Sequence, residues 1–346
     1  MLTKQTDRSR RRTGWAALAV ASFLVACAQT PPPTSAPVSA DVPDPADALS
    51  LHFVEYVRAP PSAVWSALTT PEQTRQFFHR TAVQVDLREG GVLEHRTADG
   101  SRVVIAGRVR RADAPHTLAY DFRFPEYEDT ATQVTYTTED VGDGTTRLTI
   151  DHEGFPGRTK TYRRVIDGWP PVLSGLKTLL ESGDPLPIPS FATGVGKAPA
   201  PDHPQQRYVA YIATTPTALW GALTEPSLTE KYFHGMRIAG ELAAGGPIAY
   251  TRGTPAAPAI EGTLLHVEPG RGLSFTFQRA GVDDERPSQV RYEIDDLGEG
   301  VCRLIVLHDF ETESETYRRV AHGWPPIVSG LKTLLESGTS LPIALR

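Results

Sequence analysis

The stretch TYRRVIDGWPPVLSGLKTLLESG, residues 161–183, occurs a second time as TYRRVAHGWPPIVSGLKTLLESG, residues 316–338, with 19 of 23 positions identical. Residues 54–79 and 209–234 repeat at the same offset of 155 residues, with 12 of 26 positions identical. An equal offset at both ends indicates that one whole unit was duplicated. The unit is much longer than the about 20–50 residues of a solenoid repeat, so we predict two complete domains, each with its own core.

The chain around the two copies divides into further segments. We expect a signal peptide at 1–26, a tether at 27–48, the first domain at 49–188, a linker at 189–205 and the second domain at 206–346. Residues 28–48 contain six prolines and no aromatic residue. Such a segment cannot bury enough apolar surface to offset its ordering entropy, so we predict an extended tether.

The amino terminus has the composition of an export signal. Five basic residues within residues 1–12 precede the apolar run WAALAVASFLVA at 15–26, which is shorter than the about 20 residues that span a bilayer. The sequence Leu24-Val25-Ala26-Cys27 resembles the bacterial lipobox, in which cleavage before the cysteine accompanies its acylation. We therefore predict an exported lipoprotein, anchored to a membrane of the bacterial cell envelope through acylated Cys27 and facing the periplasm in a Gram-negative cell. An ordinary signal peptide that contains a cysteine, and twin-arginine export suggested by residues 9–13, remain alternatives.

Charge and cysteine content narrow the function classes. Residues 1–26 carry five basic side chains and one acidic one, so their removal takes the formal net charge from −6 to about −10. That acidity argues against a nucleic-acid partner, which requires a basic surface. With Cys27 acylated, Cys302 is the remaining thiol, and its apolar surroundings, VCRLIVLH, favour a buried strand residue over a nucleophile.

Each copy has the same order of predicted elements. An opening strand with alternating apolar residues precedes two short helices that begin near prolines, and about six strands separated by Gly, Asp and Pro follow. The turn at Asp143-Gly144 favours antiparallel pairing. The copy ends on a long helix whose apolar stripe in the first copy comprises Tyr162, Val165, Trp169, Leu173, Leu176 and Leu180. The fold class is therefore α+β.

This order of elements resembles the START-like superfamily (SRPBCC, Bet v 1-like), whose helix-grip fold wraps a curved antiparallel sheet of about six to seven strands around the long helix. The branch that it resembles most is the activator of heat-shock protein 90 ATPase homologues. The residues that carry the resemblance include AVWSALT with Pro71, Phe77-Phe78, Gly90-Gly91, His152, and Gly168-Trp169 through Glu181, and the second copy matches at Pro226, Tyr232-Phe233, Gly245-Gly246, His308, and Gly323-Trp324 through Glu336. The resemblance covers nearly all of both domains.

One departure from the family concerns the long helix. The family's helix usually continues through Gly-Trp, whereas here two prolines follow at 170–171 and at 325–326. Proline inside a helix removes an N–H donor and crowds the preceding turn, at about 3 kcal/mol or more. We therefore expect a break or sharp kink at Gly168 and Gly323.

The resemblance implies an apolar cavity between the sheet and the long helix. The residues that we expect to line it in the first domain are Phe78, Tyr120, Phe122, Tyr162, Trp169 and Leu173, and those in the second are Phe233, Phe275, Phe277, Tyr317, Trp324 and Val328. The alternative is that these side chains only fill the two cores.

Histidines and arginines offer further candidates. His79 and His234 end the second short helices, and His152 and His308 lie on the last strands, where Glu153 or Asp309 could support a general base. We expect neither a metal nor a cofactor, because no metal-ligand spacing, nucleotide-binding glycine pattern or nucleophile motif occurs. The adjacent pairs Arg163-Arg164 and Arg318-Arg319 are expected to be solvated or salt-bridged, with an anion site as the alternative.

The resulting hypothesis is an envelope-anchored lipoprotein that binds small hydrophobic ligands or lipids in its START-like cavities. Two alternatives remain: a protein–protein interaction module of the envelope with filled cores, and a cyclase- or hydrolase-like enzyme. The candidate residues and the absence of catalytic motifs favour ligand binding over catalysis.

Overall fold

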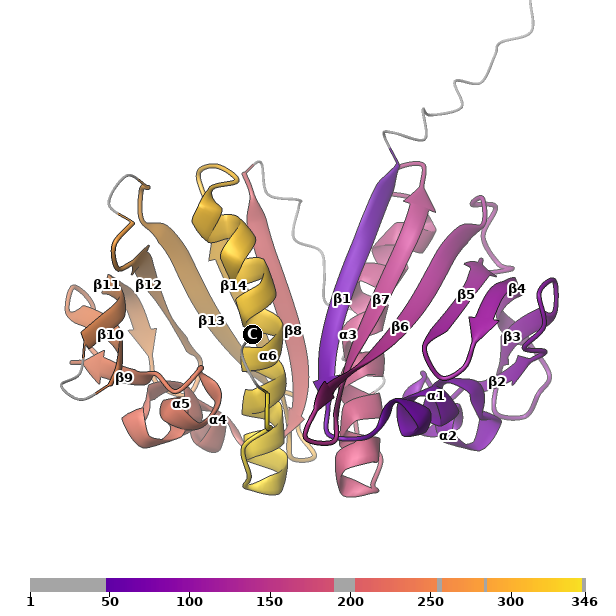
Figure 1. Ribbon diagram of the computed structural model, residues 1–346, viewed down its shortest axis with the longest axis horizontal. Helices are drawn as coiled ribbons and strands as arrows, with labels where there is room; N and C mark the ends of the chain where they lie inside the picture. Colours follow the sequence, from indigo (N-terminus) through magenta and orange to yellow (C-terminus); the bar gives the residue numbers. More distant parts are fainter. Residues whose placement is uncertain (1–47, 190–202, 254–256, 283–284, 344–346) are drawn as a thin grey trace, which may run out of the picture. The chain divides into compact units, whose positions relative to one another are not determined.

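The computed structural model describes residues 48–189, 203–253, 257–282 and 285–343 (Figure 1). The predicted signal peptide, Cys27, nearly all of the tether and most of the linker lie outside these residues. Both domains belong to one compact unit of the chain.

The first domain consists of seven strands and three helices. In chain order they are β1 (Leu49–Val57), α1 (Pro61–Thr69), α2 (Pro71–Phe77), β2 (Ala82–Val85), β3 (Val92–Arg96), β4 (Val103–Asp113), β5 (Thr117–Phe122), β6 (Thr132–Gly142), β7 (Thr145–Phe155) and α3 (Lys160–Ser182). The strands form one antiparallel sheet in the order β1-β7-β6-β5-β4-β3-β2.

The second domain repeats this plan. Its elements are β8 (Gln205–Ala213), α4 (Pro216–Thr224), α5 (Pro226–Tyr232), β9 (Arg237–Gly240), β10 (Pro247–Arg252), β11 (Ala257–Glu268), β12 (Gly272–Arg279), β13 (Ser288–Asp296), β14 (Val301–Asp309) and α6 (Glu315–Ser337). The sheet order β8-β14-β13-β12-β11-β10-β9 is that of the first domain. Two antiparallel sheets of seven strands, each followed by a long helix, confirm the predicted α+β helix-grip fold.

Local sequence accounts for the helix boundaries. Each short helix begins with a proline in its first turn, where the missing N–H has no intrahelical partner to lose. The side chain of Thr159 accepts a hydrogen bond from the Tyr162 N–H at the start of α3, and Ser314 does the same for Tyr317 at the start of α6. Both long helices end at a left-handed glycine.

A glycine within each long helix lets the second short helix pack closely against it. A Cβ at Gly175 would lie 3.0 Å from the Phe77 Cβ of α2, and one at Gly330 would lie 3.3 Å from the Tyr232 Cβ of α5. Glycine in a helix interior costs about 1 kcal/mol relative to alanine. The repeated SGLK sequence accepts this cost because the short helix occupies the space of a side chain.

The long helices are not broken at the prolines, whereas a sharp kink there, the other form of this expectation, stays a prediction. Helix α3 runs without interruption from Lys160 to Ser182, with Pro170 and Pro171 inside it, and α6 contains Pro325 and Pro326 in the same way. The prolines of α3 withhold N–H donors from the carbonyls of residues 166 and 167, which are half-buried residues. Water can replace a lost donor more easily at a half-buried position than in the core, which agrees with an unbroken helix.

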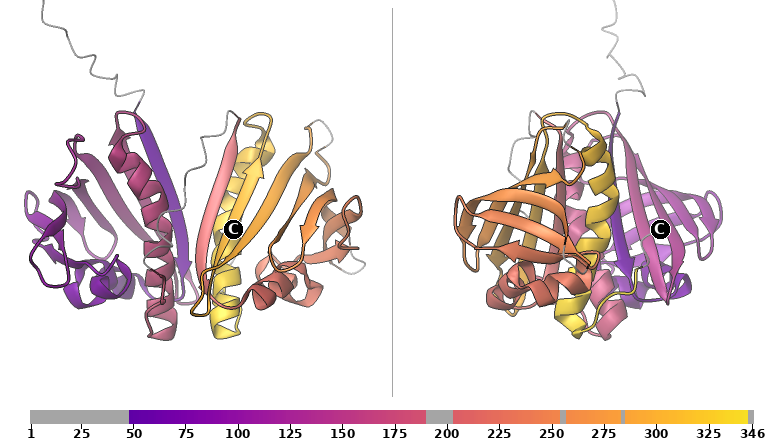
Figure 2. Two further views of the ribbon diagram at one scale, coloured as in Figure 1. Left: turned by 180° about the vertical axis from the view of Figure 1, so that it is seen from behind. Right: turned by 60° about the vertical axis from the view of Figure 1, so that its left-hand side comes forward.

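Each long helix contacts the first strands of both domains. Helix α3 packs on β1 and on β8, α6 packs on β8 and on β1, and the two helices touch (Figures 1 and 2). At this junction Lys177 and Lys332 have side chains with 0% exposure. The Lys177 ammonium donates to the Tyr56 carbonyl of β1 and to Glu181, both at 2.6 Å, and Lys332 donates to the Tyr211 carbonyl and to Glu336. Each buried lysine thus joins its helix to the first strand of its own domain.

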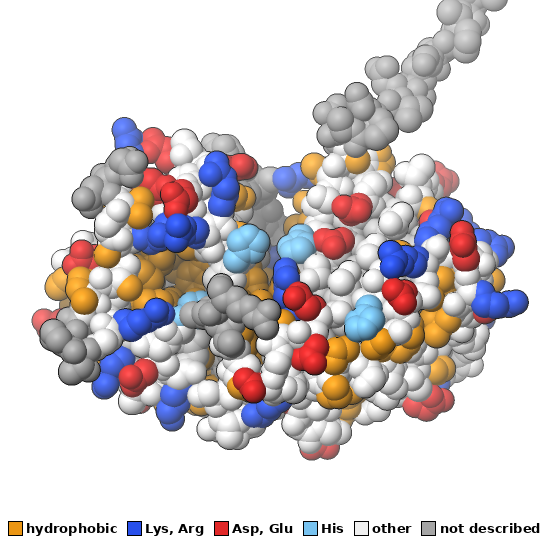
Figure 3. All heavy atoms as spheres, viewed as in Figure 1, with side chains coloured by type: hydrophobic (Ala, Val, Ile, Leu, Met, Phe, Trp, Pro, Cys, Tyr) orange, Lys and Arg blue, Asp and Glu red, His pale blue; other side chains and the backbone are white. Residues whose placement is uncertain are grey.

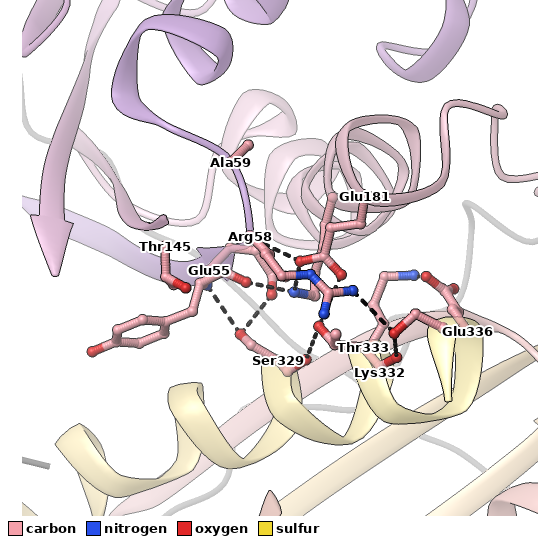
Figure 4. Close-up of polar contacts among 12 residues, drawn as sticks. Glu55, Arg58, Ala59, Thr145, Glu181, Ser329, Lys332, Thr333 and Glu336 are labelled. Atoms are coloured by element: carbon pink, nitrogen blue, oxygen red, sulfur yellow. Dashed lines mark hydrogen bonds and ion pairs between the residues drawn. The ribbon is translucent and has the colours of Figure 1, made fainter. Parts of the chain in front are cut away.

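Equivalent hydrogen bonds between the two domains occur twice at this junction, and Figure 4 shows those of Ser329 and Thr333. The hydroxyl of Ser329 accepts from the Tyr56 N–H at 3.1 Å, and the hydroxyl of Ser174 accepts from the Tyr211 N–H at 3.0 Å. Thr333 donates to Glu181 at 2.8 Å, while its counterpart Thr178 donates to Glu336 at 3.0 Å. The duplicated sequence SGLKTLLES therefore supplies both halves of the contact.

Glu55 breaks the symmetry of this junction. It is buried, it accepts a hydrogen bond of 2.6 Å from Ser329, and the matching residue of the second domain is Ala210. Removal from water raises the pKa of the Glu55 carboxyl, and this outweighs the opposing effect of the Lys177 charge. The junction consequently contains one carboxyl group more than its two Lys–Glu pairs require.

We predict that Glu55 weakens the protein at high pH. An unfolded glutamate ionises near pH 4.3, whereas folded Glu55 holds its proton to higher pH, so stability is lost as the pH rises from about 4.3 through the raised pKa. The free energy of unfolding of Glu55→Gln should equal that of the wild type at pH 4. At pH 8 it should be higher, by about 1.4 kcal/mol for each unit by which folding raises the pKa of Glu55. Urea unfolding at both pH values measures this difference.

The exposed Glu128→Gln substitution is the matched control and should show no such pH-dependent gain. The prediction would be contradicted if the free energy of unfolding of Glu55→Gln differed from that of the wild type by the same amount at pH 4 and at pH 8.

Candidate functional site

A pocket of about 650 Å³ opens in the first domain between α2, the sheet and α3. Apolar side chains from α2, β4, β5 and α3, and from the residues that follow α2 and β5, form the interior of the pocket. They are Phe77, Phe78, Val104, Ile105, Phe122, Phe124, Val165, Trp169 and Val172. The polar residues at the pocket are Arg75, Gln76, His79, Arg80, Thr81 and Arg164. This volume lies within the roughly 300–1,000 Å³ of small-molecule sites, which are mostly apolar with a few polar groups.

The segment that follows α3 completes the pocket wall. Pro185, Leu186, Pro187 and Ile188 all line it. Leu186 also packs in a buried cluster with Tyr211 and Val301 of the second domain. One wall of the first domain's pocket is therefore held by the second domain. Sequence analysis assigned no binding role to this segment, although its equivalent SLPI at residues 340–343 repeats the pattern LPI.

The predicted lining residues of the first domain divide into two groups. Phe78, Phe122 and Trp169 line the pocket. Tyr120 instead lies in the core with its hydroxyl 2.8 Å from that of Tyr136, Leu173 is a core residue, and half-buried Tyr162 packs edge-on against Phe155. Whether any of these side chains binds a ligand stays a prediction.

The predicted residues of the second domain are not brought together around its described pocket. Phe233 stacks on Tyr250 at 4.3 Å between ring centroids, Phe277 packs on His308, and Tyr317 packs on Phe310. Phe275 and Trp324 belong to the core, and half-buried Val328 packs against it.

His152 is fixed by hydrogen bonds at both ring nitrogens. The Trp169 indole N–H donates to its Nδ1 at 3.1 Å, so the proton of the neutral ring lies on Nε2, which donates to the Thr132 hydroxyl at 2.7 Å. Thr132 in turn donates to the Phe122 carbonyl at 3.1 Å. Burial lowers the pKa of His152 to about 3. The ring is thus a structural link between α3 and the sheet, without a free nitrogen to act as a general base.

The second domain contains the same series of hydrogen bonds, from a tryptophan through a histidine and a hydroxyl to a backbone carbonyl. Trp324 donates to His308 Nδ1 at 3.0 Å, the His308 Nε2 lies 2.8 Å from the Ser288 hydroxyl, and Ser288 donates to the Phe277 carbonyl at 3.2 Å. Burial lowers the pKa of His308 to about 3. Ser288 takes the place of Thr132, and the hydrogen bonds of the histidine are the same in both domains. We therefore assign this network a structural role in both copies.

His79 lies at the mouth of the pocket and contacts α3 near the prolines. Its Nε2 donates to the Gly168 carbonyl at 3.1 Å, and His234 makes the equivalent contact with Gly323 at 3.3 Å. The residue is exposed to the open pocket, yet the surrounding protein lowers its pKa through desolvation. Both histidines therefore position the long helix against the second short helix.

The described residues of the second domain form a smaller pocket of about 210 Å³. It is lined by Lys231, Tyr232, His234, Gly235, Pro326, Gly330, Leu341 and Ile343, which match eight lining positions of the first domain. Two matched positions have larger side chains in this domain, Met236 in place of Thr81 and Tyr250 in place of His95, whereas Ala259 is smaller than its counterpart Val104. Figure 3 shows hydrophobic side chains within a hollow on the visible face of the second domain.

Other candidate chemistry finds no support in the described part of the chain. Cys302 is buried in β14, burial raises its thiol pKa to about 11, and the thiol donates to the Thr214 carbonyl at 3.3 Å. No group of three or more His, Cys, Asp or Glu residues is placed to hold a metal ion within residues 48–343, gaps excepted. Over the same residues, no helix is both long and apolar enough to cross a membrane.

The buried histidines should stay neutral well below pH 6.5. Because their folded pKa values lie near 3, the unfolded chain takes up protons that the folded chain refuses, and stability is lost as the pH falls from about 6.5 toward 3, by up to about 1.4 kcal/mol per pH unit for each histidine. Nitrogen NMR of the rings at pH 5 should show His152 and His308 as neutral Nε2–H tautomers. A ring that titrates near pH 6.5 in the folded protein would overturn this assignment.

Comparison with known proteins places these observations in a family. The family model for Activator of Hsp90 ATPase homolog 1-like protein matches residues 58–181 and again residues 213–336, together more than two thirds of the chain. No curated protein matches the chain.

Three solved structures are among those to which this chain is similar. CalU16 from Micromonospora echinospora is 24% identical over 39% of this chain and 78% of its own, with a TM-score of 0.33. An Hsp90 activator from Plasmodium falciparum is 22% identical over 35% and 87%, with a TM-score of 0.31. DynU16, a putative protein of the dynemicin biosynthetic locus, is 18% identical over 84% and 98%, with a TM-score of 0.34.

The two family-model matches fall on the two helix-grip domains, so the chain belongs to the Activator of Hsp90 ATPase homolog 1-like protein family and contains two tandem copies of its domain.

Proposed function

We propose that this chain is a lipoprotein of the bacterial cell envelope whose first domain binds small hydrophobic molecules or lipids. The observation that carries the proposal is the pocket of about 650 Å³, whose interior is formed by aromatic and aliphatic side chains. Burial of an apolar ligand there would release about 25 cal/mol for each Å² removed from water. The second domain packs against Leu186, which lines the pocket wall, and has a smaller pocket of its own.

Membrane attachment completes the proposed role. Acylated Cys27 and the proline-rich tether would hold the domains near the lipid surface, facing the periplasm in a Gram-negative cell. A tethered pocket could accept an apolar molecule that leaves the membrane and shield it from water.

The open pocket favours this role over the two alternatives. An interaction module with filled cores would leave no such volume in the first domain. A cyclase- or hydrolase-like mechanism requires a proton acceptor, whereas both ring nitrogens of His152 and of His308 are engaged in hydrogen bonds.

Narrowing the pocket should weaken ligand binding. Val104 is half-buried and lines the pocket from β4, so Val104→Trp places an indole in the ligand's volume. We expect the affinity of the full chain for dodecanol, measured by calorimetry, to fall at least about tenfold, which corresponds to about 1.4 kcal/mol.

The matched control is Ala259→Trp, at the equivalent position of the second domain and outside the described lining residues of its pocket. The proposal fails if the wild type binds no apolar ligand, or if both variants bind dodecanol as tightly as the wild type does.

Attachment to the envelope should depend on Cys27. Cys27→Ser removes the sulfur that would carry the lipid, so the variant should leave the membrane fraction and remain in the soluble fraction of the envelope. The control is Cys302→Ser, because Cys302 is the other cysteine of the chain and is buried in β14. Mass spectrometry of the amino-terminal peptide identifies the modification. Equal membrane attachment of Cys27→Ser and the wild type would contradict the prediction.

A further inference from the structure

The mouth of the first domain's pocket is strongly basic. Arg75 of α2, Arg80 of the turn after it and Arg164 of α3 all line the pocket, whereas no described Asp or Glu does. This imbalance occurs in a chain whose formal net charge is −6. The described lining residues of this pocket therefore carry a net positive charge.

Two of these arginines have no counter-ion among the residues that the structure describes. Arg164 forms an ion pair with Glu126 and lies over the Phe124 ring, with its guanidinium carbon 4.0 Å from the ring centroid. Arg75 and Arg80 are exposed and make neither an ion pair nor a side-chain hydrogen bond with any described residue. Their charges are available to a ligand.

The second domain shows that the fold does not need these two charges. Its residues at the matching positions are Glu230 and Gly235, and Glu230 lies 3.6 Å from Arg237. The comparison is direct because α2 and α5 have the same length and the same proline start. The fold therefore forms without a cation at either position.

Arg80 also occupies an unfavourable backbone conformation. Its φ is +57°, in the left-handed region that glycine tolerates and side-chain-bearing residues avoid, and Gly235 has φ +71° at the same place. Residues held in such conformations concentrate at ligand-binding positions. The first domain thus keeps a cation where glycine would relieve the backbone.

We propose that the first domain binds an amphiphile whose apolar tail enters the pocket and whose carboxylate or phosphate head contacts Arg75 and Arg80. This inference rests on the proposed function and adds the chemical class of the ligand. The interior around Phe122 and Trp169 suits the tail. The guanidinium fork matches the paired oxygens of a carboxylate or a phosphate, and charge-assisted hydrogen bonds of this kind are stronger than neutral ones.

The test compares ligands that differ only in the head group. Dodecanoate, dodecyl phosphate, dodecanol and dodecylamine are titrated by calorimetry into the full mature chain, because the pocket wall includes the segment held by the second domain. We expect the two anionic ligands to bind at least about tenfold more tightly than dodecanol, with dodecylamine weakest. Added salt should weaken the anionic ligands and leave dodecanol unchanged.

The variants replace each arginine with the residue of the second domain. In Arg75→Glu/Arg80→Gly, dodecanoate affinity should fall about tenfold or more while dodecanol affinity stays within about twofold. The melting temperature should not fall, since the second domain folds with these residues. The charge control is Arg123→Glu, whose exposed side chain lies between the lining residues Phe122 and Phe124 in sequence but is not part of the lining.

The outcomes separate the two proposals. Dodecanol binding without any preference for dodecanoate or dodecyl phosphate overturns this inference and leaves the apolar pocket intact. An equal loss of dodecanol and dodecanoate in the double variant, or an equal loss of dodecanoate in Arg123→Glu, also overturns it. If none of the four ligands binds, the proposed function fails together with the inference. A preference for one anionic head over the other identifies the carboxylate or the phosphate as the natural group.

Discussion

The two buried lysines at the junction of the long helices are the constraint on which the rest of the structure depends. An ammonium group removed from water is very unfavourable unless charges and hydrogen-bond acceptors surround it. Lys177 meets this requirement with the Tyr56 carbonyl and Glu181, and Lys332 meets it with the Tyr211 carbonyl and Glu336. Replacing such pairs by apolar residues is often neutral for stability, so we assign them a positioning role: they fix each helix against its first strand.

That position determines the pocket. Helix α3 is held at its carboxyl-terminal half by Lys177, in its middle by the bond from Trp169 to His152, and beside the prolines by the bond from His79 to Gly168. The wall of the pocket is therefore preformed, and the segment around Leu186 extends it while packing on the second domain. The two domains share this framework and differ at the pocket mouth. The residue of the second domain that is equivalent to Arg80 is Gly235.

Sequence patterns predicted the fold because the duplication let each pattern be read twice, and strand alternation and the helical stripe agreed in both copies. A break at the prolines was expected from the lost N–H donors alone, and the long helices are nevertheless continuous, with residues 166 and 167 only half-buried. Tyr120 and Leu173 share the apolar pattern of lining residues such as Phe122 and Trp169, and only the folded packing shows that they lie in the core. Arg75 and Arg80 were missed, although comparison of the copies would have shown that these positions differ.

The most direct measurement is native mass spectrometry of the full mature chain purified from the envelope of its own host, followed by denaturing extraction. The account predicts one acidic amphiphile per chain, lost from the Arg75→Glu/Arg80→Gly variant purified in the same way. A chain that carries only neutral lipid, or one that carries no small molecule and is not stabilised by any amphiphile, would contradict it.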